Sequence, residues 1–530
     1  MKDDNTALLE IRLDNDVQRH RDNPFIFDHR SLRDYQEGIL KGVELIQKKM
    51  SAADKPFSGV LPHELAVKFE NVDLDRPFAQ LSDALAEIEE LYLNDAIYFH
   101  HPRYVAHLNC PIVIPAILAE VILSSINSSL DTWDQSAGGT FIEQKLIDWT
   151  AGRIGLGPQA DGIFTSGGTQ SNLMAMLLAR DSHCAKTRGC DATKLQGLPE
   201  DFHKLRIFAS QASHFSVQKA AAILGLGYNS VVPISYDHCF RMDVRALERE
   251  INRCLAQGLT PMAVVATAGT TDFGSIDPLT DIAEICRAHG LWMHADAAYG
   301  CGLLVSQRHR HLLSGIQHAD SVTVDYHKSF LQPVSCSAFL VKDGKNLSFV
   351  TCHTEYLNPV SQLKEGTPNL VNKSIQTTRR FDGLKLWLTL RTMGADKIGV
   401  AFDQVIDLAK QVYRLFLSDE TIEVLHQPEL STLVFRYHPS AHQPEHEVDE
   451  LNVYIRKALF RSGAAVVAST KVEGRRYLKF TLLNPASTIE DIREIVALIK
   501  QHGRQYQHQQ AHRPRSSRGQ SLLMAEVDDE

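Results

Sequence analysis

The sequence has little that would direct it to a membrane, to nucleic acid or to an oxidising compartment. Its longest apolar stretch, Pro111 to Leu123, contains Glu120 and is too short to cross a bilayer. A formal net charge of −9 gives no basic excess, and no Lys- and Arg-rich run alternates with aromatic residues, so nucleic acid is not an expected partner. Residues 1–5 carry no apolar signal region. We therefore expect a cytoplasmic protein with no membrane partner.

Cysteine pairs are also missing. The nine cysteines include no C-x-x-C motif. Cys184 and Cys190 lie near each other in a polar stretch and could bind a metal, but no ordered set of further ligands follows them. We expect reduced, mostly buried thiols and no metal site.

What the chain does have is an ordinary globular composition, with 44% hydrophobic and 22% charged residues. Its 530 residues are too many for one simple core. We expect a helical N-terminal segment over residues 1–110, a large α/β domain over 111–385 and a small α+β domain over 386–502. The remainder, 503–530, is rich in Gln, His, Arg and Ser, buries little and is expected to be a disordered tail.

Strands and helices alternate through the large domain. Residues 278–289 have helical spacing, with Asp277 as a plausible N-cap and Gly290 as terminator. Alternation of this kind predicts an α/β fold with a mainly parallel sheet. The seven expected strands are 162–165, 205–209, 230–234, 263–268, 291–296, 321–325 and 337–341.

Periodicity also predicts elements outside that domain. Apolar spacing favours helices over 32–50 and 78–93, and a long helical pattern from 375 to 416. The C-terminal part has three β-rich runs, expected as strands over 432–437, 464–469 and 477–483.

An acid and an amine follow two neighbouring expected strands. Asp296 ends the run that begins at Trp292, and Lys328 follows the run that ends at Asp325. This pair suits pyridoxal phosphate (PLP), because a lysine amine forms a Schiff base and an aspartate keeps the pyridine nitrogen protonated. Ala298 is small enough to lie flat under a ring. Because the strand before Lys328 is apolar, we expect a desolvated lysine whose pKa is lowered.

A glycine-containing turn provides a candidate phosphate site. Gly167, Gly168 and Thr169 lie between an expected strand and a helix expected over 173–180. Glycines and hydroxyl groups at a helix N-terminus let backbone N–H groups approach a phosphate. A capped strand–helix turn would have the same pattern. No Gly-Lys-Ser/Thr or G-x-G-x-x-G motif follows.

Three further residues are candidates for the same edge of the sheet. His214 could stack on a cofactor ring, Thr271 could reach its phenolic oxygen, and His327 could bind a phosphate oxygen or act as an acid or base. Each of the three also has a purely structural explanation, in packing or in a capped turn.

Taken in order, these motifs resemble those of the group II PLP-dependent amino-acid decarboxylases, over roughly residues 90–500. The resemblance implies the fold type I, aminotransferase-like architecture, with a mainly parallel seven-stranded sheet and a small α+β domain. It also implies a homodimer, or a higher oligomer, with active sites at the subunit interface.

The resemblance implies roles for individual residues. Lys328 would carry the cofactor, Asp296 would pair with the pyridine nitrogen, and Ala298 and His214 would sandwich the ring. Gly167, Gly168, Thr169 and His327 would hold the phosphate, and Thr271 would contact the ring oxygen. Tyr356, in a segment similar to the family's mobile loop, would return a proton to the substrate Cα, alone or with His214; Arg379, Arg380 and Lys385 resemble an arginine-containing helix after that loop. Asp325 stands where relatives often have asparagine.

Whole-segment likeness around residues 98–111 and 130–139 favours L-lysine as substrate. Such enzymes make cadaverine for hydroxamate siderophores of the desferrioxamine type. L-2,4-Diaminobutyrate and L-ornithine decarboxylases are the alternatives. A decarboxylating aldehyde synthase is disfavoured by Tyr356, and an inactive PLP-fold binding protein is disfavoured by Lys328, Asp296 and His214.

Overall fold

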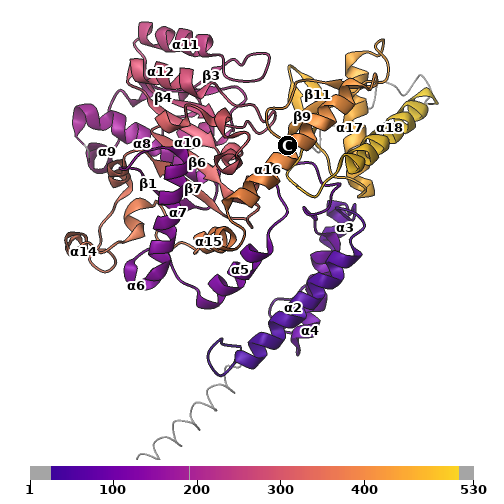
Figure 1. Cartoon of the computed structure of the whole chain (residues 1–530), viewed down its shortest axis with the longest axis horizontal. Coiled ribbons are helices and arrows are strands. Elements are labelled where there is room, and N and C mark those ends of the chain that lie inside the picture. Colours follow the sequence, from indigo (N-terminus) through magenta and orange to yellow (C-terminus); the bar gives the residue numbers. More distant parts are fainter. Residues whose placement is uncertain (1–24, 190, 513–530) are drawn as a thin grey trace, which may run out of the picture. The chain divides into compact units, whose positions relative to one another are not determined.

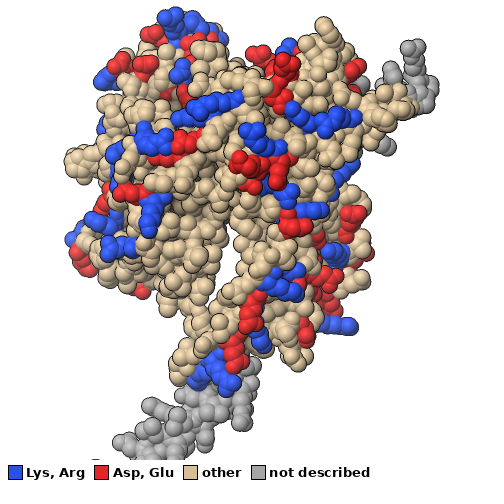
Figure 2. All heavy atoms as spheres, turned by 45° about the vertical axis from the view of Figure 1, so that its right-hand side comes forward, with Lys and Arg blue, Asp and Glu red and all other residues tan. Residues whose placement is uncertain are grey.

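The computed structural model describes residues 25–189 and 191–512 (Figure 1). The chain groups into two compact units. One comprises the N-terminal segment up to Tyr98 with Arg461–Gly463, and the other comprises the rest. Among the described residues, none of the helices combines the length and the apolar character needed to cross a membrane. On the face shown in Figure 2, acidic and basic side chains are interspersed.

The described part of the N-terminal unit, which starts at residue 25, is helical, with α2 (Leu32–Ala52), α3 (Pro62–Val67), α4 (Leu81–Leu91) and the 3₁₀ turn η1 (Leu93–Asp95); residues 1–24 of the expected helical segment lie outside the described residues. The helix expected over 32–50 is α2, while the one expected over 78–93 is shortened at both ends as α4. Lys48 and Lys49 of α2 pair with Glu89 of α4 at 3.0 and 2.7 Å, which links the two helices.

The large sheet has the seven strands expected from the sequence, in the order β1-β7-β6-β5-β4-β2-β3. Neighbours from β6 through β5, β4 and β2 to β3 run parallel, whereas β7 is antiparallel to β6 and β1. The strands are β1 (Asp161–Thr165), β2 (Leu205–Ser210), β3 (Val231–Ile234), β4 (Thr260–Thr267), β5 (Trp292–Ala297), β6 (Ser321–Asp325) and β7 (Ser337–Val341). The predicted α/β fold with a mainly parallel seven-stranded sheet is confirmed.

Helices cover both faces of this sheet, which is why its strands are apolar on both sides. In β4, Val264 and Ala266 enter the core with α7 (Gly138–Ile154), α11 (Val244–Ala256) and α12 (Leu279–His289). The alternate residues Ala263 and Val265 enter a second core with α8 (Gly168–Arg188) and α10 (Ser216–Ile223). Because β1 runs in the same direction as β6, the ends of β1, β2, β4, β5 and β6 meet at one edge.

Asp277 is not the N-cap of α12, contrary to the expectation. Pro278 takes that position. The Asp277 side chain is buried instead, and its two oxygens accept hydrogen bonds from the backbone N–H groups of Met242 and Thr267, both at 2.7 Å. Burial raises the pKa of Asp277 to about 7. Sequence spacing alone could not show this tertiary contact.

The C-terminal part forms an antiparallel four-stranded sheet of order β10-β11-β9-β8, with helices α17 (Glu445–Ser462) and α18 (Ile489–Ala511). Its strands are β8 (Ile422–Val424), β9 (Thr432–Tyr437), β10 (Ala468–Val472) and β11 (Arg475–Thr481). The strand expected over 464–469 begins only at Ala468, because Val466 instead makes an isolated parallel bridge with Tyr104. The short strand β8 was not expected.

The long helical pattern from 375 to 416 is two helices, α15 (Gly383–Thr392) and α16 (Ala395–Leu417). Gly394, with φ of 80°, separates them. Residues 375–382 are not helical, and the boundary proposed between 385 and 386 falls inside α15. Shorter helices are α5 (Ile114–Ile126), α6 (Trp133–Ser136), α9 (Ala192–Gln196), α13 (Tyr326–Ser329) and α14 (Val360–Glu365).

Helix α18 continues to Ala511, so the expectation of a disordered tail beginning at 503 is wrong for residues 503–511. Gly503 is buried against the ring of Tyr437, and Tyr506 packs on Tyr454 with ring centroids 4.9 Å apart. These contacts stabilise the last turns of α18 by burying part of their surface. Residues 513–530 lie outside the described part of the chain.

Candidate active site

One cavity, of about 310 Å³, lies where the strand ends of the large sheet meet. The structure brings all the expected cofactor-binding residues into its lining: Gly167, Gly168, Thr169, His214, Thr271, Asp296, Ala298, His327 and Lys328. They come from the ends of five different strands or from the segments that follow them, which is the position that open α/β sheets use for ligands. Tyr356 is not among the lining residues.

The glycine turn forms the N-terminus of α8, which begins at Gly168 rather than at Leu173. The first N–H groups of a helix have no partner within the helix and favour an anion. Gly168 also fits a tight place, because an added Cβ would lie 3.0 Å from Asp325 Oδ2 and 3.4 Å from the Ala298 Cβ. The backbone at Gly168 therefore approaches the floor of the cavity closely.

Asp296 is fixed at the end of β5 by two hydrogen bonds. Asn172 Nδ2 donates to Oδ2 at 2.8 Å, and the backbone N–H of Ala298 donates to Oδ1 at 3.1 Å. The carboxyl group is thus held in one orientation at the cavity wall. Asn172 lies three residues after Thr169 of the glycine turn, and the sequence pattern did not predict this role for it.

Behind Asp296 lies a buried polar relay. Asn172 Oδ1 accepts a hydrogen bond from Thr323 at 2.9 Å and lies 3.0 Å from His294 Nε2, while His294 Nδ1 lies 2.9 Å from Ser321 Oγ. Burial lowers the pKa of His294 to about 4, so the imidazole is neutral near pH 7. Because the His294 ring is neutral, it contributes hydrogen bonds to this relay and places no positive charge beside Asp296.

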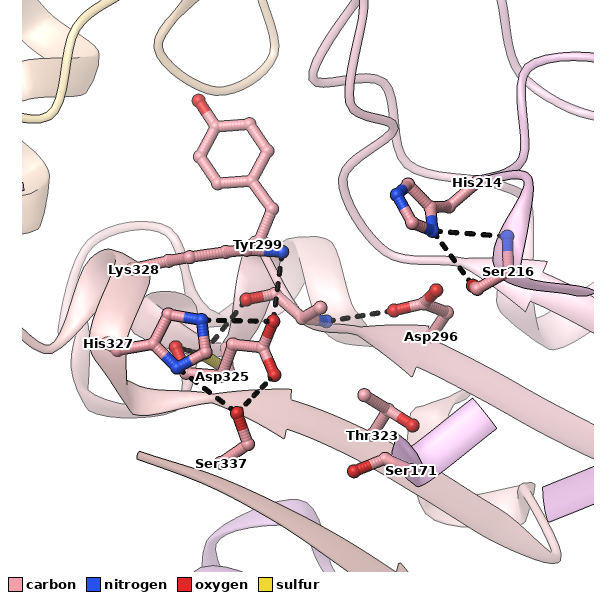
Figure 3. A network of polar contacts seen from close by, with 12 residues as sticks. Ser171, His214, Ser216, Asp296, Tyr299, Thr323, Asp325, His327, Lys328 and Ser337 are labelled. Atoms are coloured by element: carbon pink, nitrogen blue, oxygen red, sulfur yellow. Dashed lines mark hydrogen bonds and ion pairs between the residues drawn. The ribbon is translucent and has the colours of Figure 1, made fainter. Parts of the chain in front are cut away.

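His214 occupies another wall of the cavity (Figure 3). Its Nδ1 lies 2.8 Å from Ser216 Oγ and accepts a longer hydrogen bond, of 3.3 Å, from the backbone N–H of Ser216. Burial lowers the pKa of His214. The His214 ring is therefore neutral and held in place at the cavity that Asp296 also lines.

Lys328 is paired with a carboxylate, a contact that the sequence analysis did not predict. Its Nζ lies 2.9 Å from Asp325 Oδ2, and Ser337 donates to Asp325 Oδ1 at 2.7 Å (Figure 3). Burial by itself lowers the lysine pKa, but the charge of Asp325 outweighs it, and the pKa of Lys328 is raised. The expectation of a lowered pKa is therefore wrong for the site as it stands in this structure.

His327 completes this side of the cavity. Its Nδ1 accepts a hydrogen bond from the backbone N–H of Cys336 at 3.2 Å, and its Nε2 lies 3.7 Å from Asp325 Oδ2. Burial lowers the pKa of His327. The loop at Cys336 thus orients the ring whose Nε2 faces the cavity floor.

The segment expected to act as a mobile loop lies outside the cavity. Tyr356 is 87% exposed, while Asn358 at the base of the loop is buried and donates to Cys352 O and Asn372 Oδ1, both at 2.7 Å. The loop tip is therefore exposed and its base is anchored.

The basic residues after the loop do not line the cavity either. Arg379 is buried and pairs with Glu143 at 2.9 Å, while Arg380 pairs with Glu120. Lys385 is fully buried and pairs with Asp382 at 2.7 Å. These residues fasten the segment before α15 and the start of that helix.

Elsewhere in the described part of the chain, Asp237, His238 and Cys239 bring three possible ligand atoms within 4.8 Å of one another. The Asp237 carboxylate already accepts hydrogen bonds from the guanidinium of Arg241, at 3.0 and 2.8 Å. The group lacks a free carboxylate and does not argue for a metal.

The residues at the cavity fit pyridoxal phosphate. A lysine amine, a fixed aspartate, a neutral imidazole and a close-approaching helix N-terminus surround one opening of suitable size. This donor set at the strand ends of a mainly parallel sheet defines a PLP-dependent enzyme of fold type I.

The chain belongs to the pyridoxal-dependent decarboxylase family. The family's conserved domain matches residues 70–438. An L-2,4-diaminobutyrate decarboxylase of Acinetobacter baumannii is 38% identical over 91% of this chain and 96% of the relative. A second enzyme of that description, from Rhizobium meliloti (strain 1021), is 39% identical over 92% and 95%.

Solved structures agree with this assignment. The decarboxylase domain of a Vibrio parahaemolyticus protein described as diaminobutyrate-pyruvate transaminase and L-2,4-diaminobutyrate decarboxylase has a TM-score of 0.82, with 34% identity over 91% of this chain and 97% of that one. Oryza sativa TDC with PLP and tryptamine has a TM-score of 0.83 at 23% identity, over 91% and 100%, which shows the fold. The protein is a PLP-dependent amino-acid decarboxylase. None of these relatives is a lysine decarboxylase, so the lysine, cadaverine and siderophore expectations find no support in them.

Proposed function

We propose that this enzyme removes the α-carboxylate of L-2,4-diaminobutyrate, giving 1,3-diaminopropane and carbon dioxide. The observation that carries the proposal is the identity of 38–39% with two L-2,4-diaminobutyrate decarboxylases, across more than nine-tenths of both chains in each case. This was the alternative in the sequence analysis, and it replaces lysine as the favoured substrate.

In this proposal the cavity residues divide the work of holding the cofactor. Lys328 would attach it, Asp296 would pair with its pyridine nitrogen, and Gly167, Gly168, Thr169 and His327 would hold its phosphate. His214 and Ala298 would hold the ring between them, and Thr271 would contact the ring oxygen. When bound, PLP supplies an electron sink for the electron pair released as the Cα–carboxylate bond breaks. The hydrogen bonds from Asn172 and Ala298 support the role of Asp296, because they hold its carboxyl group in one orientation.

The chain's own side chains manage the substrate and its protons. His214, neutral and fixed by Ser216, packs beside the reacting carbon and helps to exclude water. Tyr356 donates the proton that replaces carbon dioxide at Cα, alone or with His214. The exposed tip and anchored base of its loop support a closing movement over an active site.

We further propose a homodimer, or a higher oligomer built from it, with the active site at the subunit interface. The exposure of Tyr356 and its absence from the cavity lining of its own chain support this arrangement.

The test is carbon dioxide release and diamine formation by the purified, PLP-loaded enzyme with L-2,4-diaminobutyrate, L-ornithine, L-lysine and an aromatic amino acid at equal concentrations. Lys328→Ala gives the background. Preference for diaminobutyrate supports the proposal, whereas preference for lysine would restore the earlier expectation and overturn it. No release from any substrate, with the cofactor bound, would favour a binding protein instead.

A further inference from the structure

A buried carboxylate lies on the floor of the cavity, below the helix N-terminus where the phosphate is proposed to bind. Only 2% of the Asp325 side chain is exposed. Its Oδ2 is the atom that a Cβ on Gly168 would approach to 3.0 Å, and Ser337 fixes its Oδ1. The carboxylate of Asp325 therefore lies next to Gly168, the first residue of α8.

This placement conflicts with an anionic ligand. A phosphate monoester is close to a dianion above pH 7, because its second pKa is about 6. Two like charges at a buried site repel strongly, and the usual result is that one of them gains a proton. The conflict applies to Asp325 in particular, since its side chain is buried and Ser337 holds one of its two oxygens by a hydrogen bond.

We propose that Asp325 binds the cofactor's phosphate as the neutral acid, donating a hydrogen bond, so that one proton is taken up when the phosphorylated cofactor binds. The inference rests on the proposed placement of the phosphate at Gly168, and it does not depend on which amino acid is the substrate.

Among the charged and titratable groups around it, Asp325 is the one expected to take up this proton. On the same segment, the Lys328 ammonium forms an ion pair with Asp325 in this structure. That amine is the group proposed to bind the cofactor covalently. His327 is neutral because burial lowers its pKa. Two thiols also lie near this segment: Cys301 in η4 (Gly300–Val305) and Cys336 just before β7. Burial raises the pKa of both thiols, so both stay protonated. Across the cavity, Asp296 adds a negative charge and His214 is neutral.

The direction of the pH effect follows from linkage. The charge of Lys328, together with the hydrogen bond from Ser337, outweighs burial and holds the pKa of Asp325 below its usual value in this structure. If a phosphate raises that pKa, binding takes up a proton, and affinity falls as pH rises between the two values. One proton corresponds to at most about a tenfold weakening per pH unit.

The experiment compares PLP with pyridoxal, which lacks the phosphate, on the full chain stripped of cofactor. Dissociation constants are measured by absorbance and fluorescence from pH 7 to 9 for the wild type and Asp325→Asn. The dissociation constant of pyridoxal divided by that of PLP gives the contribution of the phosphate to affinity, since both ligands react with Lys328 through the same carbonyl group. Asp281→Asn, at an exposed position of α12, is the matched control, and near-ultraviolet circular dichroism verifies that each variant is folded.

We expect the wild-type ratio to fall by up to about tenfold per pH unit, and the Asp325→Asn ratio to be nearly flat and at least about tenfold larger at pH 8.5. A ratio with the same pH dependence in both proteins would overturn the inference while leaving the substrate proposal intact. Thr169→Ala should lower the ratio if the phosphate lies at α8. No change in that variant would remove the placement and the inference together. Failure to decarboxylate diaminobutyrate, with the expected ratios, would remove only the substrate proposal.

Discussion

At the scale of single residues, Lys328 provides the most direct test of the site. Its Nζ faces the cavity beside Asp325, and within the described part of the chain no other lysine lines that cavity. Lys328→Ala should abolish the visible absorbance of lysine-linked cofactor and nearly all carbon dioxide release, because covalent attachment and carbonyl chemistry need the amine. Lys345→Ala, at an exposed position, is the control. A Lys328→Ala enzyme with an unchanged spectrum and full turnover would contradict the assignment.

The buried imidazole of His294 predicts a pH-dependent part of the stability. Its pKa of about 4 lies below the ordinary value of about 6.5, so the unfolded chain binds the extra proton first. The contribution of neutral His294 to the free energy of unfolding is fully present above pH 6.5. It is lost as the pH falls toward 4, by at most about 3 kcal/mol.

His294→Gln should therefore lower stability at pH 7, by breaking the relay to Asn172, yet show a shallower decline between pH 6.5 and 4. Denaturant unfolding at several pH values measures both effects, with the exposed His63→Gln as a control for the loss of a histidine. Parallel pH profiles for His294→Gln and the wild type would contradict the prediction.

At the scale of elements, the turn between β10 and β11 carries strain that a substitution should relieve. Glu473 has φ of 49° and Gly474 has φ of 85°, in a two-residue hairpin turn that favours Asn-Gly. Glu473→Asn should stabilise the protein by roughly 0.5–1 kcal/mol, and Gly474→Ala should destabilise it by a similar amount or more. Thermal unfolding measures both, and activity should change in neither. Equal stability of Glu473→Asn and the wild type would mean that the turn is unstrained.

The strands of the large sheet could be predicted because each is a short apolar run bounded by turn residues. The errors occurred where a tertiary contact decides the outcome. Asp277 satisfies two distant N–H groups instead of capping a helix, and Val466 bridges to Tyr104 before β10 begins. Residues 375–382 have helical spacing, but ion pairs of Arg379 and Arg380 hold them in an irregular path.

The candidate site was predictable for a related reason. Parallel strands present their carboxyl ends at one edge, so Asp296, Lys328 and His214 had to lie near one another. The relay through Asn172 and His294 could not be predicted from spacing, because it is a tertiary contact between α8 and the face of β5 on which that helix packs. The Asp325–Lys328 ion pair needed the chain to turn at the end of β6.

At the scale of the whole molecule, α2 has an apolar side that is exposed among the described residues. Ile39, Val43, Ile46 and Met50 share one side of the helix and are each 41–47% exposed. Fully burying such a side chain is worth about 1.5–3 kcal/mol, so an exposed stripe of this kind indicates a partner, here proposed to be a second copy. Val43→Asp should shift the protein toward monomer in sedimentation, whereas Lys41→Asp, on the opposite side of α2, should not. A Val43→Asp protein that sediments like the wild type would place the interface elsewhere.

Mixing two inactive variants tests whether the active site is shared between subunits. Lys328→Ala lacks the cofactor-bearing amine, and Tyr356→Phe, which keeps its cofactor, should lose roughly 10²–10⁴-fold in turnover because it lacks the proton donor. If Tyr356 serves the cavity of a partner subunit, a mixed dimer has one complete site, with Lys328 from one chain and Tyr356 from the other. Random reassembly of equal amounts should then restore about a quarter of wild-type activity, since half of the dimers are mixed and each has one working site of two. If Tyr356 serves its own chain, neither site in a mixed dimer is complete and the mixture stays inactive. Recovery that rises and falls with the mixing ratio would exclude contamination, because only mixed dimers can supply both groups.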